Sequence, residues 1–233
     1  AQRTYVPHSV LASGNWFKIA IPGPGVYRLD IPFLQTLGLN PQGMPSGSIR
    51  LYGFDGGMLP ENPGTPRPDD LVENALWAED GGDGVLDNND YLVFFSKGPH
   101  HWIPDAANRS FRHVKNLYSE QSFYFLTVGG TGKRISLQSA TGAPNTTIRN
   151  FSERYFYELD SVNILSSGKD WFGYDFSEIP GKSLRHTFSV DLPGLIPASA
   201  LFRAKCISRS FGNGSNFGFS LNGGIANQLS FEI

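Results

Sequence analysis

Residues 80–95, which read DGGDGVLDNNDYLVFF, decide the fold of this chain. The first part of the stretch is an acidic loop with four carboxylates and three glycines, and the glycines let the backbone bend tightly around whatever the carboxylates face. The last part, residues 91–95, carries no charge and is rich in aromatic side chains, which predicts a strand buried on both faces. The stretch therefore predicts a β-sheet core that is entered through an acidic turn.

The composition of the 233-residue chain favours an all-β protein. Charged residues make up 17% and aromatic residues 13%, with 27 glycines and 16 prolines, a profile typical of short strands joined by many turns. The net charge of −2 leaves no basic surface for nucleic acid or an anionic membrane. No apolar run is long enough for a membrane span. Cys206 is the single cysteine, which excludes an intrachain disulfide and a cysteine-based metal site.

Alternating hydrophobicity predicts strands on both sides of the acidic stretch. In residues 9–21 the side chains of Phe17, Ile19 and Ile21 share one face, which predicts a strand with that face buried. The Pro- and Gly-containing turn at residues 22–25 predicts a hairpin that returns through residues 26–29. Further strands are predicted at residues 48–52, 70–79, 122–128 and 133–137, and loops at residues 53–69 and 96–118.

One short helix is predicted after the first strands. Asp30 occupies the position of a helix N-cap, Pro32 falls in the first turn, and Gly38 follows the last apolar residue. The run at residues 70–79 fits a short helix about as well as a strand, and its neighbours favour the strand.

The composition changes at residues 139–150, a small and polar segment that is the best linker candidate. Six apolar runs follow, which fit a sandwich or jelly roll. They are residues 151–159, 171–176, 184–190, 201–208, 217–221 and 229–233. We therefore expect two β-sandwich or jelly-roll-like domains, residues 1–140 and 141–233, with very little helix. Because the sequence ends within a strand-like run, we expect a fragment of a longer polypeptide that is truncated before a further domain.

The acidic loop is a candidate calcium site. Counted from Glu79, Gly84 falls at the sixth position of an EF-hand-like loop, where the backbone turns sharply. The candidate ligands are Glu79, Asp83, Asp87 and Asp90, at positions one, five, nine and twelve. Position three is a glycine and the loop leads into a strand instead of a helix, both of which depart from the EF-hand. The alternative is a solvated turn in which the carboxylates accept backbone hydrogen bonds.

Two other groups of residues are candidates for metal binding or catalysis. The histidines His100, His101 and His113 lack a recognisable zinc-ligand spacing and are expected to be surface or packing residues. Cys206 and His186 are the one conceivable nucleophile and base, but Cys206 shares a strand face with Phe202 and Ala204, which favours a core position. No serine elbow, phosphate-binding loop or zinc-peptidase helix motif is present. The sequence thus predicts no catalytic residue and no bound organic cofactor.

Aromatic residues on a β-rich scaffold are also the means by which many modules hold carbohydrate. The candidates are Trp16, Tyr52, Trp77, Trp102, Trp171 and Phe172. The alternative is that these side chains fill the core. A carbohydrate-binding β-sandwich with structural calcium is therefore the second function that the sequence allows.

Several strings, taken in order, carry a family resemblance. They are SVLASGNWFKIAI, GVYRLD, FLQTLG, IRLYGFDGGMLPEN, DDLVENALWAEDGGDGVLDNNDYLVFF, NLYSEQSFYFLTV and GKRI, followed by SSGKDWFGYDF. In this order they resemble the N-terminal region of the sortases of the type IX secretion system of Bacteroidetes, which are gingipain-like cysteine peptidases. The resemblance spans residues 9–176.

This resemblance implies a function for the parent polypeptide. The family removes C-terminal sorting domains from secreted proteins and attaches the cargo to the cell surface, so export to the outer membrane is implied; the start Ala1-Gln2 would suit a processed chain. The catalytic motifs have no counterpart here, so the resemblance implies a non-catalytic accessory region. Its expected partners are the downstream catalytic domain and an outer-membrane protein of the secretion system, with no nucleic acid.

Overall fold

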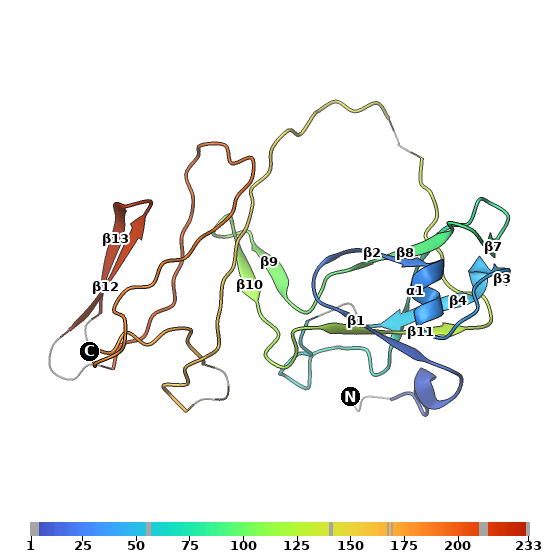
Figure 1. Ribbon diagram of the computed structural model, residues 1–233, viewed down its shortest axis with the longest axis horizontal. Helices are drawn as coiled ribbons and strands as arrows, with labels where there is room; N and C mark the ends of the chain where they lie inside the picture. Colours follow the sequence, from blue (N-terminus) through green and yellow to red (C-terminus); the bar gives the residue numbers. More distant parts are fainter. Residues whose placement is uncertain are drawn as a thin grey trace. The chain divides into compact units, whose positions relative to one another are not determined.

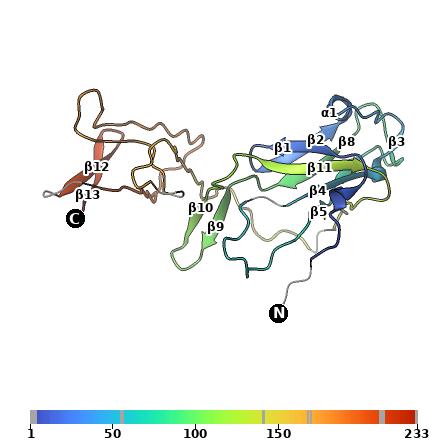
Figure 2. The same ribbon diagram turned by 90° about the horizontal axis from the view of Figure 1, so that it is seen from below.

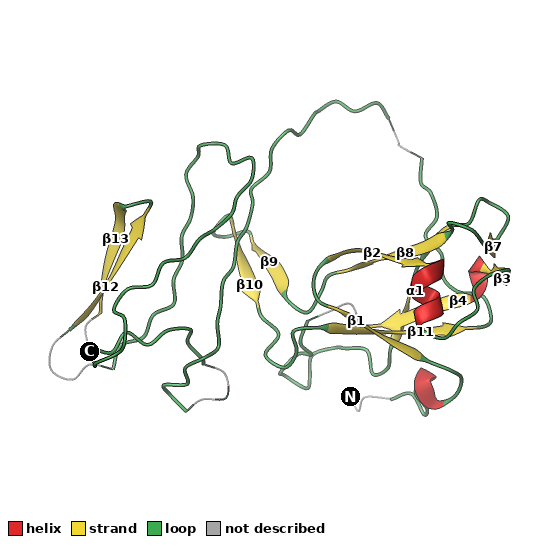
Figure 3. Ribbon diagram, in the orientation of Figure 1, coloured by secondary structure: helices red, strands yellow, loops and turns green. Residues whose placement is uncertain are grey.

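The computed structural model describes residues 5–54, 57–139, 142–166, 168, 170–209 and 214–231. Over these residues the secondary structure is mostly antiparallel β-strand, with one short α-helix and two 3₁₀ turns (Figures 1 and 3). The predicted all-β class is therefore confirmed. The helical elements are η1 (Val10–Ala12), α1 (Ile31–Thr36) and η2 (Ser46–Ser48). The strands are β1 (Phe17–Ile21), β2 (Gly25–Asp30), β3 (Met44–Pro45), β4 (Ile49–Gly53), β5 (Val72–Asn74), β6 (Trp77–Glu79), β7 (Val85–Leu86), β8 (Tyr91–Ser96), β9 (His101–Asp105), β10 (Ser110–Val114), β11 (Ser122–Val128), β12 (Ser215–Leu221) and β13 (Gly224–Phe231).

Contacts divide the chain into two units, Ala1–Leu184 and Arg185–Ile233. The domain boundary expected near residue 140 stays a prediction. The first unit contains a β-sandwich: a four-stranded sheet in the order β1–β11–β4–β5 and a three-stranded sheet in the order β2–β8–β6. Figure 1 shows β2 and β8 in one layer and β1, β4 and β11 in the other, and Figure 2 gives a second view of both layers.

The core lies between these two sheets and is centred on Tyr124 of β11. Its ring centroid lies 5.0 Å from that of Phe94 on β8, and its hydroxyl donates a 3.0 Å hydrogen bond to the Ser96 hydroxyl. Gly53 on the neighbouring strand is required because a Cβ there would lie 2.5 Å from the Tyr124 ring. The cluster that joins both sheets also includes Ile19, Ile21, Leu29, Ile31, Leu34, Ile49, Leu51, Leu76, Leu86, Leu92 and Leu126. Burial of these apolar side chains is the main source of stability for the sandwich.

Strands β1 and β2 do not form the hairpin that the turn at residues 22–25 predicts. Strand β1 pairs with β11, so that Ile19 lies opposite Tyr124, while β2 pairs with β8, so that Leu29 lies opposite Leu92. The turn thus carries the chain from one sheet to the other. Each strand has one apolar face, and crossing between sheets lets both faces enter the same core, which a local two-stranded ribbon could not do.

The predicted helix is present as α1 and begins as expected. The Asp30 side chain accepts a 3.0 Å hydrogen bond from the Phe33 amide, Pro32 lies in the first turn, and the Gly38 amide bonds back to the Gln35 carbonyl. Ile31 and Leu34 point into the core. The helix is two turns at most, so this packing, together with the cap, holds it in place.

Strand β8 is buried on one face only, so the prediction of a strand buried on both faces was wrong. Leu92 and Phe94 are buried, but Tyr91 and Val93 are half-buried and Phe95 is 56% exposed. The outer face is shielded in part by side chains from neighbouring strands: Trp77 is opposite Val93, and the Arg28 guanidinium lies 4.1 Å from the Tyr91 ring centroid. An uncharged strand in an antiparallel sheet can therefore still face solvent on one side.

The strand predicted at residues 133–137 is reduced to a single parallel bridge between Leu76 and Arg134. The Arg134 guanidinium instead donates hydrogen bonds to the carbonyls of Ser46, at 2.5 Å, and Ile49, at 2.9 Å. Burial lowers the pKa of this guanidinium, which is held by carbonyl dipoles. Residues 133–137 are thus joined to the end of the sandwich by the Arg134 side chain and a single bridge, and not by a continuous ladder of backbone hydrogen bonds.

The second half of the chain contains far less strand than its alternation predicts. Of the six expected runs, residues 151–159, 171–176, 184–190 and 201–208 form no strand, and Val162 and Phe172 share one isolated bridge. The predicted runs at residues 217–221 and 229–233 coincide with the β12–β13 hairpin up to Phe231; the last two residues lie outside the described part. Among the described residues no helix is long and apolar enough to cross a membrane.

Candidate functional site

The acidic loop is closed by its own carboxylates. Asp80 accepts hydrogen bonds from the Ser46 hydroxyl and the Gly82 amide, and Asp83 accepts one from the Val85 amide at 2.9 Å. The Asp87 amide donates to the Asp90 carboxylate at 2.9 Å. Within the loop, β7 pairs with β3, which was not predicted. The contacts of Asp80 with Gly82 and of Asp83 with Val85 are those of two successive Asx-type turns.

The four candidate calcium ligands are thus spread over different turns. Glu79 is exposed at the end of β6 and accepts a 3.4 Å hydrogen bond from the Trp77 indole. In the described parts of the chain, no three or more His, Cys, Asp or Glu side chains are grouped as metal ligands are. Calcium binding by Glu79, Asp83, Asp87 and Asp90 stays a prediction, and a bound ion would have to compete with the turn hydrogen bonds for the same oxygens.

Cys206 and His186 both lie in the second unit, outside any strand. Cys206 is half-buried, and this burial raises the pKa of its thiol. A nucleophilic cysteine needs the opposite shift, because the thiolate is the reactive form. His186 is exposed.

Most of the candidate carbohydrate-binding aromatics contact other side chains. Trp16 packs edge-on against Tyr52 at 5.3 Å on the outer face of the four-stranded sheet, and Trp102 packs against His113 at 4.9 Å. Trp77 is half-buried on β6. Trp171 is the most exposed of the four tryptophans, at 41%. It is therefore the best candidate for a sugar contact.

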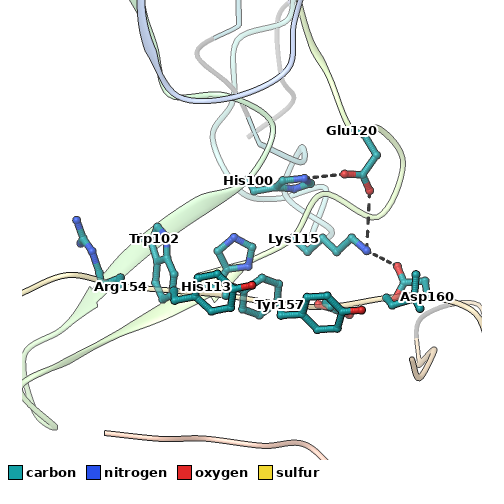
Figure 4. A pocket seen from close by; sticks show the side chains of 12 residues that line it. His100, Trp102, His113, Lys115, Glu120, Arg154, Tyr157 and Asp160 are labelled. Atoms are coloured by element: carbon teal, nitrogen blue, oxygen red, sulfur yellow. Dashed lines mark hydrogen bonds and ion pairs between the residues drawn. The ribbon is translucent and has the colours of Figure 1, made fainter. Parts of the chain in front are cut away.

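A groove lies where the sequence predicted only a loop. Strands β9 and β10 form a hairpin in which Trp102 is opposite His113, and Asp105 stabilises the turn by accepting hydrogen bonds from Asn108. The extended segment of residues 154–160 lies beside this hairpin, and an open groove of about 660 Å³ runs along the two (Figure 4). The expectation that residues 96–118 form a loop was wrong, because His and Arg residues on the strands masked their alternation.

One end of the groove is a network of charges around Lys115. The Lys115 ammonium lies 2.5 Å from the Asp160 carboxylate and 3.9 Å from that of Glu120 (Figure 4). Burial lowers the pKa of Lys115, but the hydrogen bond to Asp160 and the surrounding carboxylates outweigh it, so the pKa is raised. His100 accepts a 3.0 Å hydrogen bond from the Asn116 amide at Nδ1, which leaves its Nε2 proton to be donated to Glu120 at 3.0 Å.

The other end of the groove is aromatic. His113 stacks on Phe156 with ring centroids 3.6 Å apart, and Trp102 meets Phe156 edge-on at 6.3 Å. The Arg154 guanidinium lies 4.1 Å from the ring centroid of Phe111 and 5.8 Å from that of Trp102. Such contacts of a cation with aromatic faces are attractive.

His113 is held in its neutral form. Burial, followed by electrostatic interactions with His100, Lys115 and His101, lowers its pKa from 6.5 to about 4. Its Nδ1 atom is buried and has no hydrogen-bond partner among the described residues. The histidine therefore acts as a packing ring at neutral pH, in agreement with the expectation for this residue.

The described residues that line the groove include no serine, threonine or cysteine; its acidic and basic members are His100, His113, Lys115, Glu120, Arg154, Glu158 and Asp160. Of its residues, the sequence singled out His100, His113 and Trp102 and missed Lys115, Glu120 and the segment from Arg154 to Asp160. The spacing Asp105–Asn108 was a turn signal that could have revealed the hairpin. The segment could not have been found in this way, because it lies some 40 residues away in the sequence.

The described residues thus form an all-β sandwich and a groove along the β9–β10 hairpin. No protein-family model matches the chain, and no curated protein matches it. Among solved structures, the chain is similar to the crystal structure of dimeric latent PorU from Porphyromonas gingivalis, with 29% sequence identity and a TM-score of 0.42. The match covers 58% of this chain and 11% of the PorU chain, so this chain spans only a small part of the length of the protein it matches.

Proposed function

We propose that this chain is the non-catalytic N-terminal accessory region of a sortase of the type IX secretion system. The observation that carries the proposal is the ordered set of sequence strings from residues 9–176 that resemble that family. In the parent polypeptide, a gingipain-like cysteine peptidase would cleave C-terminal sorting domains from secreted proteins and attach the cargo to the cell surface.

The positions of the strings in the structure support this proposal. SVLASGNWFKIAI contains β1, GVYRLD forms β2, IRLYGFDGGMLPEN begins with β4, and NLYSEQSFYFLTV ends in β11. The long acidic string spans β5 to β8. These five strings therefore supply strands of one sandwich, as expected where a sequence resemblance reflects a shared core. The strings FLQTLG, GKRI and SSGKDWFGYDF supply no strand among the described residues.

We propose an architectural role for the sandwich, either bracing the catalytic domain or docking it to an outer-membrane protein of the secretion system. The raised pKa of the Cys206 thiol supports a role without cysteine chemistry of its own. A fold by itself does not define a function, so the test must be functional.

The first test measures peptidase activity of the purified chain on a secreted protein that carries its C-terminal sorting domain. We expect no cleavage above background and no effect of thiol alkylation or of Cys206→Ala. Cysteine-dependent cleavage that disappears in Cys206→Ala would refute the non-catalytic role.

The second test deletes this region from the parent gene in a bacterium that uses type IX secretion. We expect cargo to accumulate with its sorting domain attached although the catalytic residues are intact, and we expect the same result when the whole parent gene is deleted. A carbohydrate-binding module predicts a different result: cargo processing continues, and the purified chain binds lipopolysaccharide or glycans through an exposed side chain such as Trp171. Saccharide binding lost in Trp171→Ala but retained in Trp16→Ala would establish that alternative.

A further inference from the structure

The segment of residues 154–160 is held on the β9–β10 hairpin through side chains. It belongs to no strand and to no β-bridge, and all of its residues are exposed. The preceding residues 142–150 are also exposed and outside any regular structure. A segment fixed in this way opens at low cost, because no ladder of backbone hydrogen bonds has to break.

Three anchor residues of the segment match three residues of the hairpin in the same order. Arg154 contacts Phe111, Phe156 stacks on His113, and Asp160 pairs with Lys115. Phe111 and His113 lie two residues apart on β10 and Lys115 directly follows that strand, so the three share one side of an extended chain. The segment and β10 therefore run in the same direction. The segment presents a cation, an aromatic ring and a carboxylate, in this order, to three successive positions on one side of β10 and the residue after it.

The second strand of the hairpin completes the surface. Trp102 is the cross-strand neighbour of His113, and it contacts both Phe156 and Arg154. Cation–aromatic contacts and partly exposed ion pairs are individually weak, so three anchors give specific but reversible binding. The Lys115 side chain is only 14% exposed, which makes its pair with Asp160 the most shielded of the three.

We propose that this face of the β9–β10 hairpin is a docking surface for an extended polypeptide segment, and that residues 154–160 occupy it in cis. The partner segment carries an arginine, an aromatic residue two positions later and a carboxylate four positions after that. When such a segment from another polypeptide is present, it exchanges with residues 154–160. This inference stands on the groove alone and does not depend on the proposed role in secretion.

The experiment uses the full chain and a labelled synthetic peptide that copies residues 151–161. In the Phe156→Ala chain the central anchor of the resident segment is lost, so the peptide should bind about tenfold more tightly than to the wild type in fluorescence anisotropy. The matched control is Tyr155→Ala, because Tyr155 is 51% exposed and makes no ring contact with the hairpin in the structure. Peptides with alanine at the position of Phe156 or of Tyr155 provide the same comparison on the ligand, and only the first should lose affinity.

Tryptic cleavage gives an independent readout. The Arg154 guanidinium contacts two aromatic rings of the hairpin, whereas Arg149 lies in the preceding segment, outside regular structure, and serves as an internal reference. Cleavage after Arg154 relative to Arg149 should rise about tenfold in Phe156→Ala and stay unchanged in Tyr155→Ala. Equal cleavage ratios in the two variants, or peptide binding that does not distinguish them, would overturn the proposal. Amide exchange of β4 and β11 verifies in each variant that the sandwich is folded.

Discussion

The sandwich and the stretch of residues 142–209 have similar apolar alternation but place their apolar side chains differently. In the sandwich, Leu126 on β11 is fully buried between the two sheets. In the later stretch, Leu201 lies in an equally apolar run, yet it is 71% exposed and belongs to no strand. The two runs differ in their neighbouring strands. Strand β11 is flanked by β1 and β4, whereas residues 201–208 have no neighbouring strand among the described residues.

This comparison shows that alternation alone does not produce a strand. A strand gains most of its stability from cross-strand pairs and from burial of one face, and both require a non-local partner. The strands of the sandwich find their partners far along the sequence: β1 pairs with β11, and β2 pairs with β8. Periodicity therefore reports which side chains could share a face, and the core decides which of them do.

The largest expected effect comes from truncating a leucine in each region. Leu126→Ala removes a fully buried side chain and should lower the free energy of unfolding of the sandwich by about 3 kcal/mol. Leu201→Ala removes an exposed side chain and should change stability by about 0.5 kcal/mol or less. Denaturant unfolding combined with amide exchange of β4 and β11 measures both. Similar losses in the two variants would mean that residues 201–208 are packed as well as the sandwich is, and the comparison would fail.

The parts of the fold that could be predicted are those that depend on local sequence. The strands β1, β4, β8 and β11 and the cap of α1 by Asp30 were identified, because alternation, a continuous apolar run such as that of β8, and a capping residue all act within a few positions. Pairing could not be predicted: the turn at residues 22–25 indicated a hairpin, yet β1 and β2 enter different sheets. The exposure of the outer face of β8 could not be predicted either, because it depends on which distant parts of the chain cover the sheet.

The site could be predicted only in part. His100, His113 and Trp102 stood out as rare residue types, but their grouping needed the β9–β10 register, and Phe156 and Asp160 come from a distant segment. The acidic loop shows the converse case. Its carboxylates were conspicuous in the sequence, and the structure uses Asp80 and Asp83 to close turns. Composition can therefore indicate a site, but only contacts between distant segments define one.

A smaller effect is expected where the segment of residues 154–160 meets the hairpin. His113 has a folded-state pKa of about 4, below the value of 6.5 for a free histidine. The unfolded chain therefore takes up a proton as the pH falls through about 6.5 while the folded hairpin does not, so hairpin stability is complete above pH 6.5 and is lost progressively toward pH 4. Because the ring is partly solvated, we expect a loss on the order of 1 kcal/mol between pH 7 and pH 5.

Amide exchange of β9 and β10, normalised to that of β4 and β11 at each pH, measures this loss. The matched variant is His113→Phe, which keeps a ring stacked on Phe156 and removes the titrating group. Its hairpin should be equally protected at pH 7 and pH 5. A wild-type hairpin with the same protection at both values would mean that His113 is not held neutral by its surroundings.

The smallest expected effect concerns the acidic loop and its predicted calcium site. If Glu79, Asp83, Asp87 and Asp90 bind calcium with the weak affinity of extracellular sites, a Kd of about 10⁻⁴–10⁻³ M, then about 1 mM Ca²⁺ stabilises the sandwich by about 0.4–1.4 kcal/mol. Thermal unfolding with and without calcium measures this gain.

Asp83→Asn is the decisive variant, because the amide oxygen can still accept the hydrogen bond from the Val85 amide while the charge is lost. Asp105→Asn, in the turn of the β9–β10 hairpin, is the matched control and should keep the full response to calcium. A wild-type chain whose melting temperature does not respond to calcium would leave the carboxylates with the turn hydrogen bonds that the structure shows. The four acidic residues would then be comparable to the apolar runs of residues 142–209. Both patterns are conspicuous in the sequence, but the acidic residues would form no common ion site and the apolar runs form no common sheet among the described residues.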